Sequence, residues 1–226
     1  MKILLILLFL FLNFKSVAFP IPTNNIVKFD VIRKNKIIGS VETTFTEKDS
    51  NLIIQTIVDI NVKVLFIPAY KFFQKTTEIW KNNEFIEFEG YTDFEDDREY
   101  FIKGKDTENN FVVTGMDGEI ITQLNILPLN YWNKEILRQE KIFDTQKGIV
   151  RDINVKKLDN EKIIINNIEI LAEKYILNAS KNPKDLGPFP EYTIWYGKND
   201  ELIKFQFKNP KDKKIIITQR SDLSIK

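Results

Sequence analysis

Hydrophobic and polar residues alternate along most of this chain, and such alternation predicts β-strands. The longest alternating run covers residues 52–67 and keeps a period of two for about fifteen residues, whereas a helix repeats every three to four. One face of the run collects mostly hydrophobic residues, namely Ile54, Thr56, Val58, Ile60, Val62, Val64 and Phe66. The pattern therefore favours one unusually long strand at this point.

Shorter runs of the same kind follow one another with brief turns between them. They cover residues 29–33, 37–46, 72–80, 84–91, 100–105, 110–114, 119–122, 149–158, 162–165, 168–177, 192–196, 202–207 and 214–219. So many strands with short connections predict an all-β fold, in which a strongly curved antiparallel sheet forms a closed or half-open barrel. Two packed sheets are the alternative.

Two segments interrupt the strand pattern. Residues 127–139 carry an early proline and spaced hydrophobic residues, which predicts at most one short helix near residues 130–139. Residues 181–190 are rich in proline and predict a surface loop. Strand signals continue beyond both segments, so neither indicates a domain boundary.

Residues 62–80 predict two strands with a sharp corner at Pro68-Ala69, because proline lacks the N–H group that a central strand needs. After the corner, alternate residues up to Glu78 and Trp80 share one face. We expect this face to point inward, because burying a tryptophan removes a large apolar area from water. Glu78 would then be partly buried beside a lysine, an arginine or a tyrosine hydroxyl.

The N-terminus predicts a cleavable signal peptide over residues 1–18. Lys2 precedes the apolar run 3–12, and Ser16-Val17-Ala18 has small residues where a signal peptidase requires them. The apolar run is about half as long as a membrane-spanning helix, although a short N-terminal anchor is the alternative. We therefore expect one all-β domain over residues 19–226, exported to the periplasm, with no transmembrane segment after cleavage.

Composition excludes several kinds of chemistry. The chain has no cysteine, so it forms no disulfide, has no thiol nucleophile and cannot carry the lipid anchor of a bacterial lipoprotein. It has no histidine, which removes the commonest general base and the commonest transition-metal ligand. We expect no cofactor and no metal. The 33 basic and 32 acidic side chains nearly cancel, so nucleic acid is not an expected partner.

A cluster of acids at residues 93–99 resembles a calcium ligand set. No glycine lies within the cluster to make the sharp turn of a calcium loop, and Arg98 interrupts it. We interpret it as a solvated hairpin turn.

Aromatic residues are the candidates for ligand binding. In a half-open barrel they could line a cavity for an apolar ligand. A plain hydrophobic core is the alternative, because aromatic residues favour strands and dominate burial. The predicted ligand-binding residues are Tyr70, Phe72, Glu78, Trp80, Trp132 and Trp195.

Five short segments, taken in order, carry a resemblance to a known family. They are Phe29-Asp30-Val31 with Ile38-Gly39, residues 62–72 (VKVLFIPAYKF), Thr77-Glu78-Ile79-Trp80, Trp132-Asn133, and Ile194-Trp195-Tyr196 with Leu202-Ile203 and Phe207. In this order and spacing they resemble domain-of-unknown-function family DUF6134 of exported proteobacterial proteins. The resemblance implies an exported β-protein and brings no established activity. The chain departs from the family pattern at Gln74 and Lys75, where the pattern often has a histidine, and at residues 92–96, which lack an Asn-Gly turn.

Three functional hypotheses follow. The first is a non-catalytic periplasmic protein that binds a lipophilic or extended ligand, or an envelope protein, in its concave face. The second is a scaffolding or interaction module with a filled core, acting through an exposed sheet edge or the loop at residues 181–190. The third is a hydrolase that uses carboxylates, with Glu78 beside Trp80 as its acid. The size of the interior cavity discriminates the first hypothesis from the second.

Overall fold

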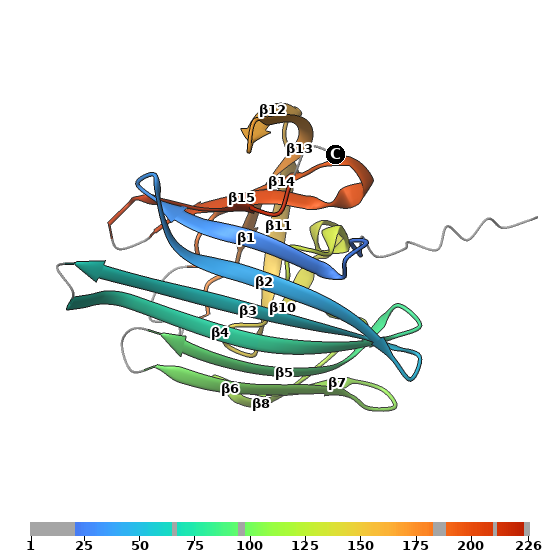
Figure 1. Cartoon of the computed structure of the whole chain (residues 1–226). Helices are drawn as coiled ribbons and strands as arrows, with labels where there is room; N and C mark the ends of the chain where they lie inside the picture. Colours follow the sequence, from blue (N-terminus) through green and yellow to red (C-terminus); the bar gives the residue numbers. More distant parts are fainter. Residues whose placement is uncertain (1–20, 65–66, 95–97, 183–188, 210–211, 224–226) are drawn as a thin grey trace, which may run out of the picture.

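The computed structural model describes residues 21–64, 67–94, 98–182, 189–209 and 212–223 (Figure 1). The predicted signal peptide at residues 1–18, acidic residues 95–97 and most of the loop at residues 181–190 lie outside this part. Within it the chain forms sixteen strands, which are β1 (Ile26–Arg33), β2 (Lys36–Lys48), β3 (Asn51–Val64), β4 (Ile67–Lys81), β5 (Glu84–Phe94), β6 (Glu99–Asp106), β7 (Phe111–Gly115), β8 (Gly118–Thr122), β9 (Leu127–Pro128), β10 (Lys141–Asp144), β11 (Ile149–Lys157), β12 (Glu161–Ile165), β13 (Ile168–Ala179), β14 (Tyr192–Tyr196), β15 (Leu202–Lys208) and β16 (Ile215–Arg220).

The strands form one large curved sheet. Its order is β8-β7-β6-β5-β4-β3-β2-β1-β16-β15-β14-β13-β11-β10-β9, with β12 paired to β13 alone. Neighbouring strands are antiparallel except for the short parallel pair β9–β10. The first strand pairs with the last, so the two halves of the chain join at β1 and β16. The sheet is strongly curved and its ends do not pair, which confirms the all-β prediction in its half-open form.

The two halves of the curved sheet touch at their hairpin turns. The Met116 N–H group beside β7 donates a hydrogen bond to the Lys147 carbonyl beside β10, at 2.7 Å. The backbones of Gly115 and Gly148 are in close contact here. A Cβ atom on either glycine would come within 2.7 Å of the other's backbone. This contact brings the sheet close to a barrel without a continuous ladder of hydrogen bonds.

The long β3–β4 hairpin corrects the predicted corner at Pro68-Ala69. β3 ends at Val64 and β4 starts at Ile67, so the chain reverses before the proline. Pro68 is the second residue of β4, beside a register shift between Val62 and Lys63. A strand start next to a bulge tolerates the missing N–H group, so proline does not set the corner here.

The interruption near residue 130 contains the predicted short helix. It is a 3-10 helix, η1, at Lys134–Arg138, and the Asn133 side chain caps it by accepting a hydrogen bond from the Glu135 N–H group at 3.0 Å. A second 3-10 turn, η2, covers Lys198–Asp200. Neither helix of the described chain has the length and apolar character needed to cross a membrane.

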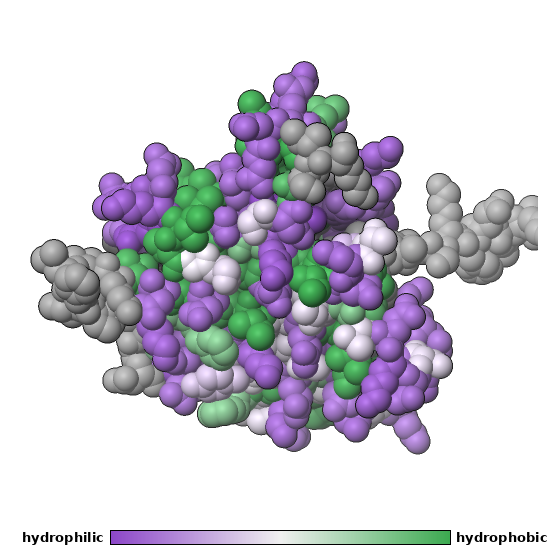
Figure 2. All heavy atoms as spheres, viewed as in Figure 1, coloured by the Kyte–Doolittle hydropathy of each residue, from purple (hydrophilic) through white to green (hydrophobic). Residues whose placement is uncertain are grey.

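The main core lies on the concave face of the sheet. Alternate residues of the strands point into it, while the outward face mixes hydrophilic and hydrophobic residues (Figure 2). A second, smaller core lies where the β12–β13 hairpin packs against β14 and β15, and consists of Ile163, Ile165, Ala172, Trp195 and Ile203. The sheet therefore buries apolar residues mainly on its inner face.

We expect Gly148→Ala to destabilise the protein more than Gly118→Ala. Both glycines have positive φ, so alanine strains the backbone at each, by about 1 kcal/mol. Only Gly148 is also crowded, by Gly115 and Ile102, whereas nothing lies within 4 Å of a Cβ atom at Gly118. Urea unfolding should show an additional loss of about 2 kcal/mol for Gly148→Ala. Equal losses would contradict the close contact between the two halves.

Candidate functional site

The inward face of β4 carries a row of buried side chains, of which two are aromatic and three are polar. Phe72, Gln74, Thr76, Glu78 and Trp80 are each at most 7% exposed. The prediction that this face points inward is therefore confirmed. A carboxylate inside such a row has lost its hydration and needs other hydrogen-bond donors.

Glu78 receives its hydrogen bonds from uncharged groups. The Asn130 Nδ2 group donates to both carboxyl oxygens, at 2.9 Å and 2.8 Å, and the Trp80 indole N–H group donates to Oε2 at 2.9 Å. The prediction that a lysine, an arginine or a tyrosine hydroxyl pairs with Glu78 is wrong. An amide from a distant segment takes that place, because the chain between β8 and β10 crosses the interior.

Burial raises the pKa of Glu78 to about 7. The hydrogen bonds from Asn130, Trp80 and Trp132 oppose this shift, because they favour the ionised carboxylate. Desolvation is the larger effect, so the carboxyl group changes its charge near neutral pH.

Aromatic rings fill the space around Glu78. The Trp132 ring meets those of Trp80 and Phe45 edge to face, each with a centroid separation of 5.7 Å. Trp80 also lies 5.3 Å from Phe85. The layer continues through four phenylalanines whose contacting centroids are 5.0–6.4 Å apart, namely Phe85, Phe88, Phe111 and Phe143. Such spacings are those of packed aromatic pairs, so this layer has a filled interior.

Residues 127–138, called the crossing segment below, connect opposite walls of the half-barrel. The Leu129 carbonyl accepts a hydrogen bond from the Thr145 hydroxyl at 3.2 Å, and the Tyr131 carbonyl accepts one from the Tyr196 hydroxyl at 2.8 Å. Ile136 has no exposed surface. These bonds hold the segment to the β10–β14 part of the sheet, and Glu78 holds it to β4 in the other half.

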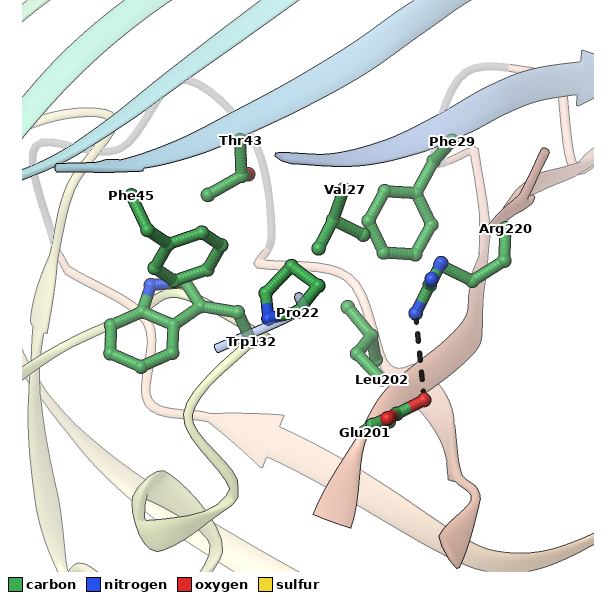
Figure 3. Close-up of a pocket in the computed structure, with 9 residues that line it drawn as sticks. All are labelled: Pro22, Val27, Phe29, Thr43, Phe45, Trp132, Glu201, Leu202 and Arg220. Atoms are coloured by element: carbon green, nitrogen blue, oxygen red, sulfur yellow. Dashed lines mark ion pairs between the residues drawn. The ribbon is translucent and has the colours of Figure 1, made fainter. Parts of the chain in front are cut away.

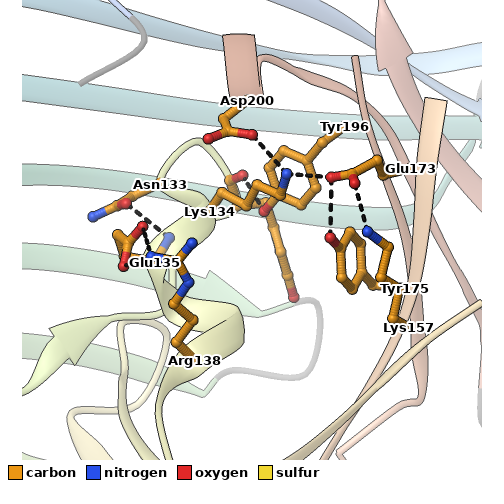
Figure 4. A network of polar contacts seen from close by, with 10 residues as sticks. Asn133, Lys134, Glu135, Arg138, Lys157, Glu173, Tyr175, Tyr196 and Asp200 are labelled. Carbon is orange, nitrogen blue, oxygen red and sulfur yellow. Dashed lines mark hydrogen bonds and ion pairs between the residues drawn. The ribbon is translucent and has the colours of Figure 1, made fainter. Parts of the chain in front are cut away.

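A polar network fixes the end of the crossing segment to β13 and η2 (Figure 4). The Lys134 ammonium group forms ion pairs with Glu173 and with Asp200, the latter at 2.6 Å. It also lies 5.7 Å and 5.6 Å from the ring centroids of Tyr175 and Tyr196. Hydrogen bonds from Lys134 and from a second lysine lower the pKa of Glu173 to about 2.

An apolar cavity beside Trp132 is small. It measures about 20 Å³, which is space for about one water molecule. Trp132 and Phe45 line one side, and the Arg220–Glu201 ion pair, at 3.9 Å, lies at another (Figure 3). A lipophilic ligand does not fit this space.

A larger groove of about 540 Å³ opens between the β2–β3 and β4–β5 turns. Trp80 and Leu52 lie in it, but most of its lining is polar, namely Glu47, Lys48, Asp49, Ser50, Asn51, Asn82 and Asn83. Its size is that of a small-molecule site, whereas its polar lining does not suit the apolar ligand expected from the sequence.

The structure brings three of the six predicted ligand-binding residues together, Glu78, Trp80 and Trp132. Phe72 lies nearer the start of β4, and its ring packs on that of Phe94 with centroids 5.2 Å apart. Tyr70 is half-buried. Burial raises the pKa of the Tyr192 hydroxyl, and the nearby Tyr70 adds to that shift. The six residues therefore do not line one cavity.

Trp195 lies on the other side of the sheet. Its neighbours Ile194 and Tyr196 are in contact with the main core, so the alternation of β14 directs Trp195 into the smaller core. Its indole N–H group donates to Glu161 at 3.1 Å, and the ammonium group of Lys204 lies 4.6 Å from its ring centroid. Trp195 is a structural residue that packs β14 against the β12–β13 hairpin.

Asn130 is the site residue that sequence reasoning missed. It follows Pro128 and Leu129 and precedes Tyr131 and Trp132, so it is a polar residue in an otherwise apolar stretch. That contrast is the signal that could have indicated a buried amide with a polar partner.

These features define a class of protein, a half-open, barrel-like antiparallel β-protein with a filled aromatic interior. Residues 29–220 match the family model described as Domain of unknown function (DUF6134), and the chain belongs to that family. A crystal structure of a β-barrel-like protein of domain of unknown function DUF1849 from Brucella abortus is similar, with a TM-score of 0.61 and 11% sequence identity over 89% of this chain and 97% of that chain. At this identity the likeness shows the fold alone. No curated protein matches the chain.

We expect Glu78→Gln to remove a pH dependence of stability. The pKa of Glu78 is raised, so its contribution to stability is complete below about 4.5 and is lost as the pH rises through about 7. The variant should therefore gain about 3 kcal/mol relative to the native chain between pH 5 and pH 9, measured by urea unfolding.

Glu173→Gln is the matched control. The pKa of Glu173 is lowered, so its contribution is complete above about 4.5 and is lost only as the pH falls through about 2. The difference between this variant and the native chain should stay constant between pH 5 and pH 9. Parallel curves for Glu78→Gln and the native chain would show that Glu78 is ionised or solvated throughout.

Proposed function

We propose that this protein is an exported, non-catalytic interaction module of the bacterial envelope that works through its outer surfaces. The observation that carries this proposal is the occupied concave face. The crossing segment and the aromatic layer fill it, and Asn130 and Trp80 satisfy the Glu78 carboxyl group. A filled interior favours a scaffold over a carrier.

The carrier hypothesis needs more space than the apolar cavity offers. Small-molecule sites occupy about 300–1,000 Å³. The apolar cavity measures about 20 Å³, and enlarging it would require displacing Trp132 or Phe45. Both rings are fully packed against neighbours, so such a displacement would expose a large apolar area to water.

Two sheet edges support an interaction role. In the described chain β8 pairs only with β7, and β12 pairs only with β13. Exposed isoleucines accompany both edges, Ile121 at 67% and Ile164 at 71% exposure. An extended segment of a partner protein can add to such an edge through main-chain hydrogen bonds. We therefore assign the partner contact to these edges.

The hydrolase hypothesis is disfavoured by the surroundings of Glu78. The carboxyl group is 1% exposed, and substrate cannot reach it without displacing the crossing segment. The groups that shift its pKa are an amide and two indoles, with no second carboxylate among them. Hydrolysis of a glycosidic bond by the usual mechanism requires two carboxyl groups.

Export and the filled interior can be tested together on tagged protein recovered from the periplasm. We expect an N-terminus at Phe19, because the signal peptide should be cleaved after Ala18. Native mass spectrometry should give the mass of residues 19–226 without an added small molecule, together with a complex that contains one protein partner.

Ile164→Asp on the β12 edge should remove this complex, whereas Ile57→Asp on the outward face of β3 should leave it intact. Ile57 is also exposed, so both changes place a charge on the surface. A co-purified lipid in place of a protein partner would favour the carrier. An uncleaved chain in the cytoplasm would refute the assignment to the envelope.

A further inference from the structure

Two lysine-rich turns that are far apart in the sequence lie side by side at one end of the sheet (Figure 1). The β1–β2 turn and the β15–β16 turn meet because β1 pairs with β16, with Arg33 opposite Ile216. An ion pair between Arg33 and Asp212 joins the two turns directly. This end of the sheet is therefore a single surface built from both ends of the chain.

Four isoleucines form a patch on the outward face of this end. Ile32 pairs with Ile37 on one side and with Ile217 on the other, and paired residues share a face. Ile215 precedes Ile217 by two residues and so points the same way. Ile37 is 66% exposed and Ile215 is 51% exposed. These four residues are called the isoleucine patch.

Exposed lysines surround the isoleucine patch. They are Lys34, Lys36, Lys208, Lys213 and Lys214. Within the described chain none of these five lysines forms an ion pair. The acid of the two turns, Asp212, is engaged by Arg33, and Asp30 lies one outward row behind Ile32. Hydrophobic residues accordingly lie beside hydrophilic ones at the upper left of Figure 2. The local charge is strongly positive although the whole chain is nearly neutral.

We propose that this end of the sheet docks on the surface of an anionic lipid membrane. Lysines near such a surface are attracted by the negative headgroups, each by about a few-fold in affinity. The isoleucine patch would enter the boundary between headgroups and acyl chains, where exposed apolar side chains are stabilised. The long lysine side chains can reach from the patch to the headgroups.

The combination of the two features selects a lipid surface over other polyanions. A nucleic acid would contact the lysines. Proteins that bind single strands also stack the bases on aromatic rings, and the isoleucine patch contains no aromatic residue. A soluble polyanion would leave the four isoleucines in water. The surface contains no residue of the aromatic layer, of the crossing segment or of the β8 and β12 edges, so this inference does not rest on the proposed function.

Vesicle flotation of the processed chain, residues 19–226, tests the proposal. The strands of the described chain lie between Ile26 and Arg220, and an attached signal peptide would itself bind lipid. We expect binding to equimolar phosphatidylglycerol and phosphatidylcholine vesicles, no binding to phosphatidylcholine alone, and release by high salt. Absence of binding to the anionic vesicles at low salt would overturn the proposal.

Two pairs of variants locate the surface. Lys34→Glu with Lys36→Glu should weaken binding at least about tenfold, whereas Lys103→Glu with Lys105→Glu on β6 changes the net charge equally and should not. Ile37→Ser with Ile215→Ser should weaken binding several-fold, whereas Ile121→Ser with Ile164→Ser should not. These side chains are exposed, so the variants should fold.

Two outcomes would refute the lipid surface even if vesicles bind. Equal loss in both charge variants would mean that net charge alone causes binding. Equally tight binding to duplex DNA, with no effect of the isoleucine changes, would identify a general polyanion site. A failure here would leave the partner contact at the β8 and β12 edges untouched, because those edges are tested by Ile164→Asp.

Discussion

The burial of one carboxyl group organises the interior of this protein. Glu78 lies on the inward face of β4, and its two oxygens accept hydrogen bonds from Asn130 of the crossing segment. An isolated buried carboxylate is costly, so these bonds are needed wherever the group is ionised. They also hold Trp132 against Trp80 and Phe45, which completes the aromatic layer. The crossing segment, the aromatic layer and the charge of Glu78 thus depend on one another.

The half-open sheet explains why a crossing segment is present. A curved sheet buries its concave face only if side chains or another segment fill it. In this chain β8 and β9 do not pair, so closure by hydrogen bonds is incomplete, and residues 127–138 fill the space between the walls. The polar groups of the crossing segment are satisfied by Thr145, Tyr196 and Glu78. The outward face, the sheet edges and the hairpin turns remain for binding.

The strands and the inward face of β4 could be predicted from the sequence because both depend on local alternation. The inward direction of Trp80 followed from its size. The end of β3 at Val64 and the start of β4 at Ile67 could not be placed, because proline is tolerated near a strand start as well as at a corner.

Asn130 lies 52 residues from Glu78 in the sequence, and only the tertiary fold brings them together. The alternation of Ile194, Trp195 and Tyr196 did contain the information that Trp195 faces the other side. The positively charged end of the sheet could not be predicted from the sequence for a different reason. Net charge averages over the chain, and residues 34–36 become neighbours of residues 208–209 and 212–214 only through the pairing of β1 with β16.

The pKa of the Glu78 carboxyl group tests most directly whether the interior is filled and closed to water. The chemical shift of the carboxyl carbon, followed by NMR against pH in a chain labelled at glutamate and assigned with Glu78→Gln, reports the pKa of that group alone. The filled interior predicts a midpoint near 7, with the indole N–H signals of Trp80 and Trp132 shifting over the same range. A midpoint near 4.5, with indole signals unaffected, would mean that water reaches Glu78 and that the concave face is open.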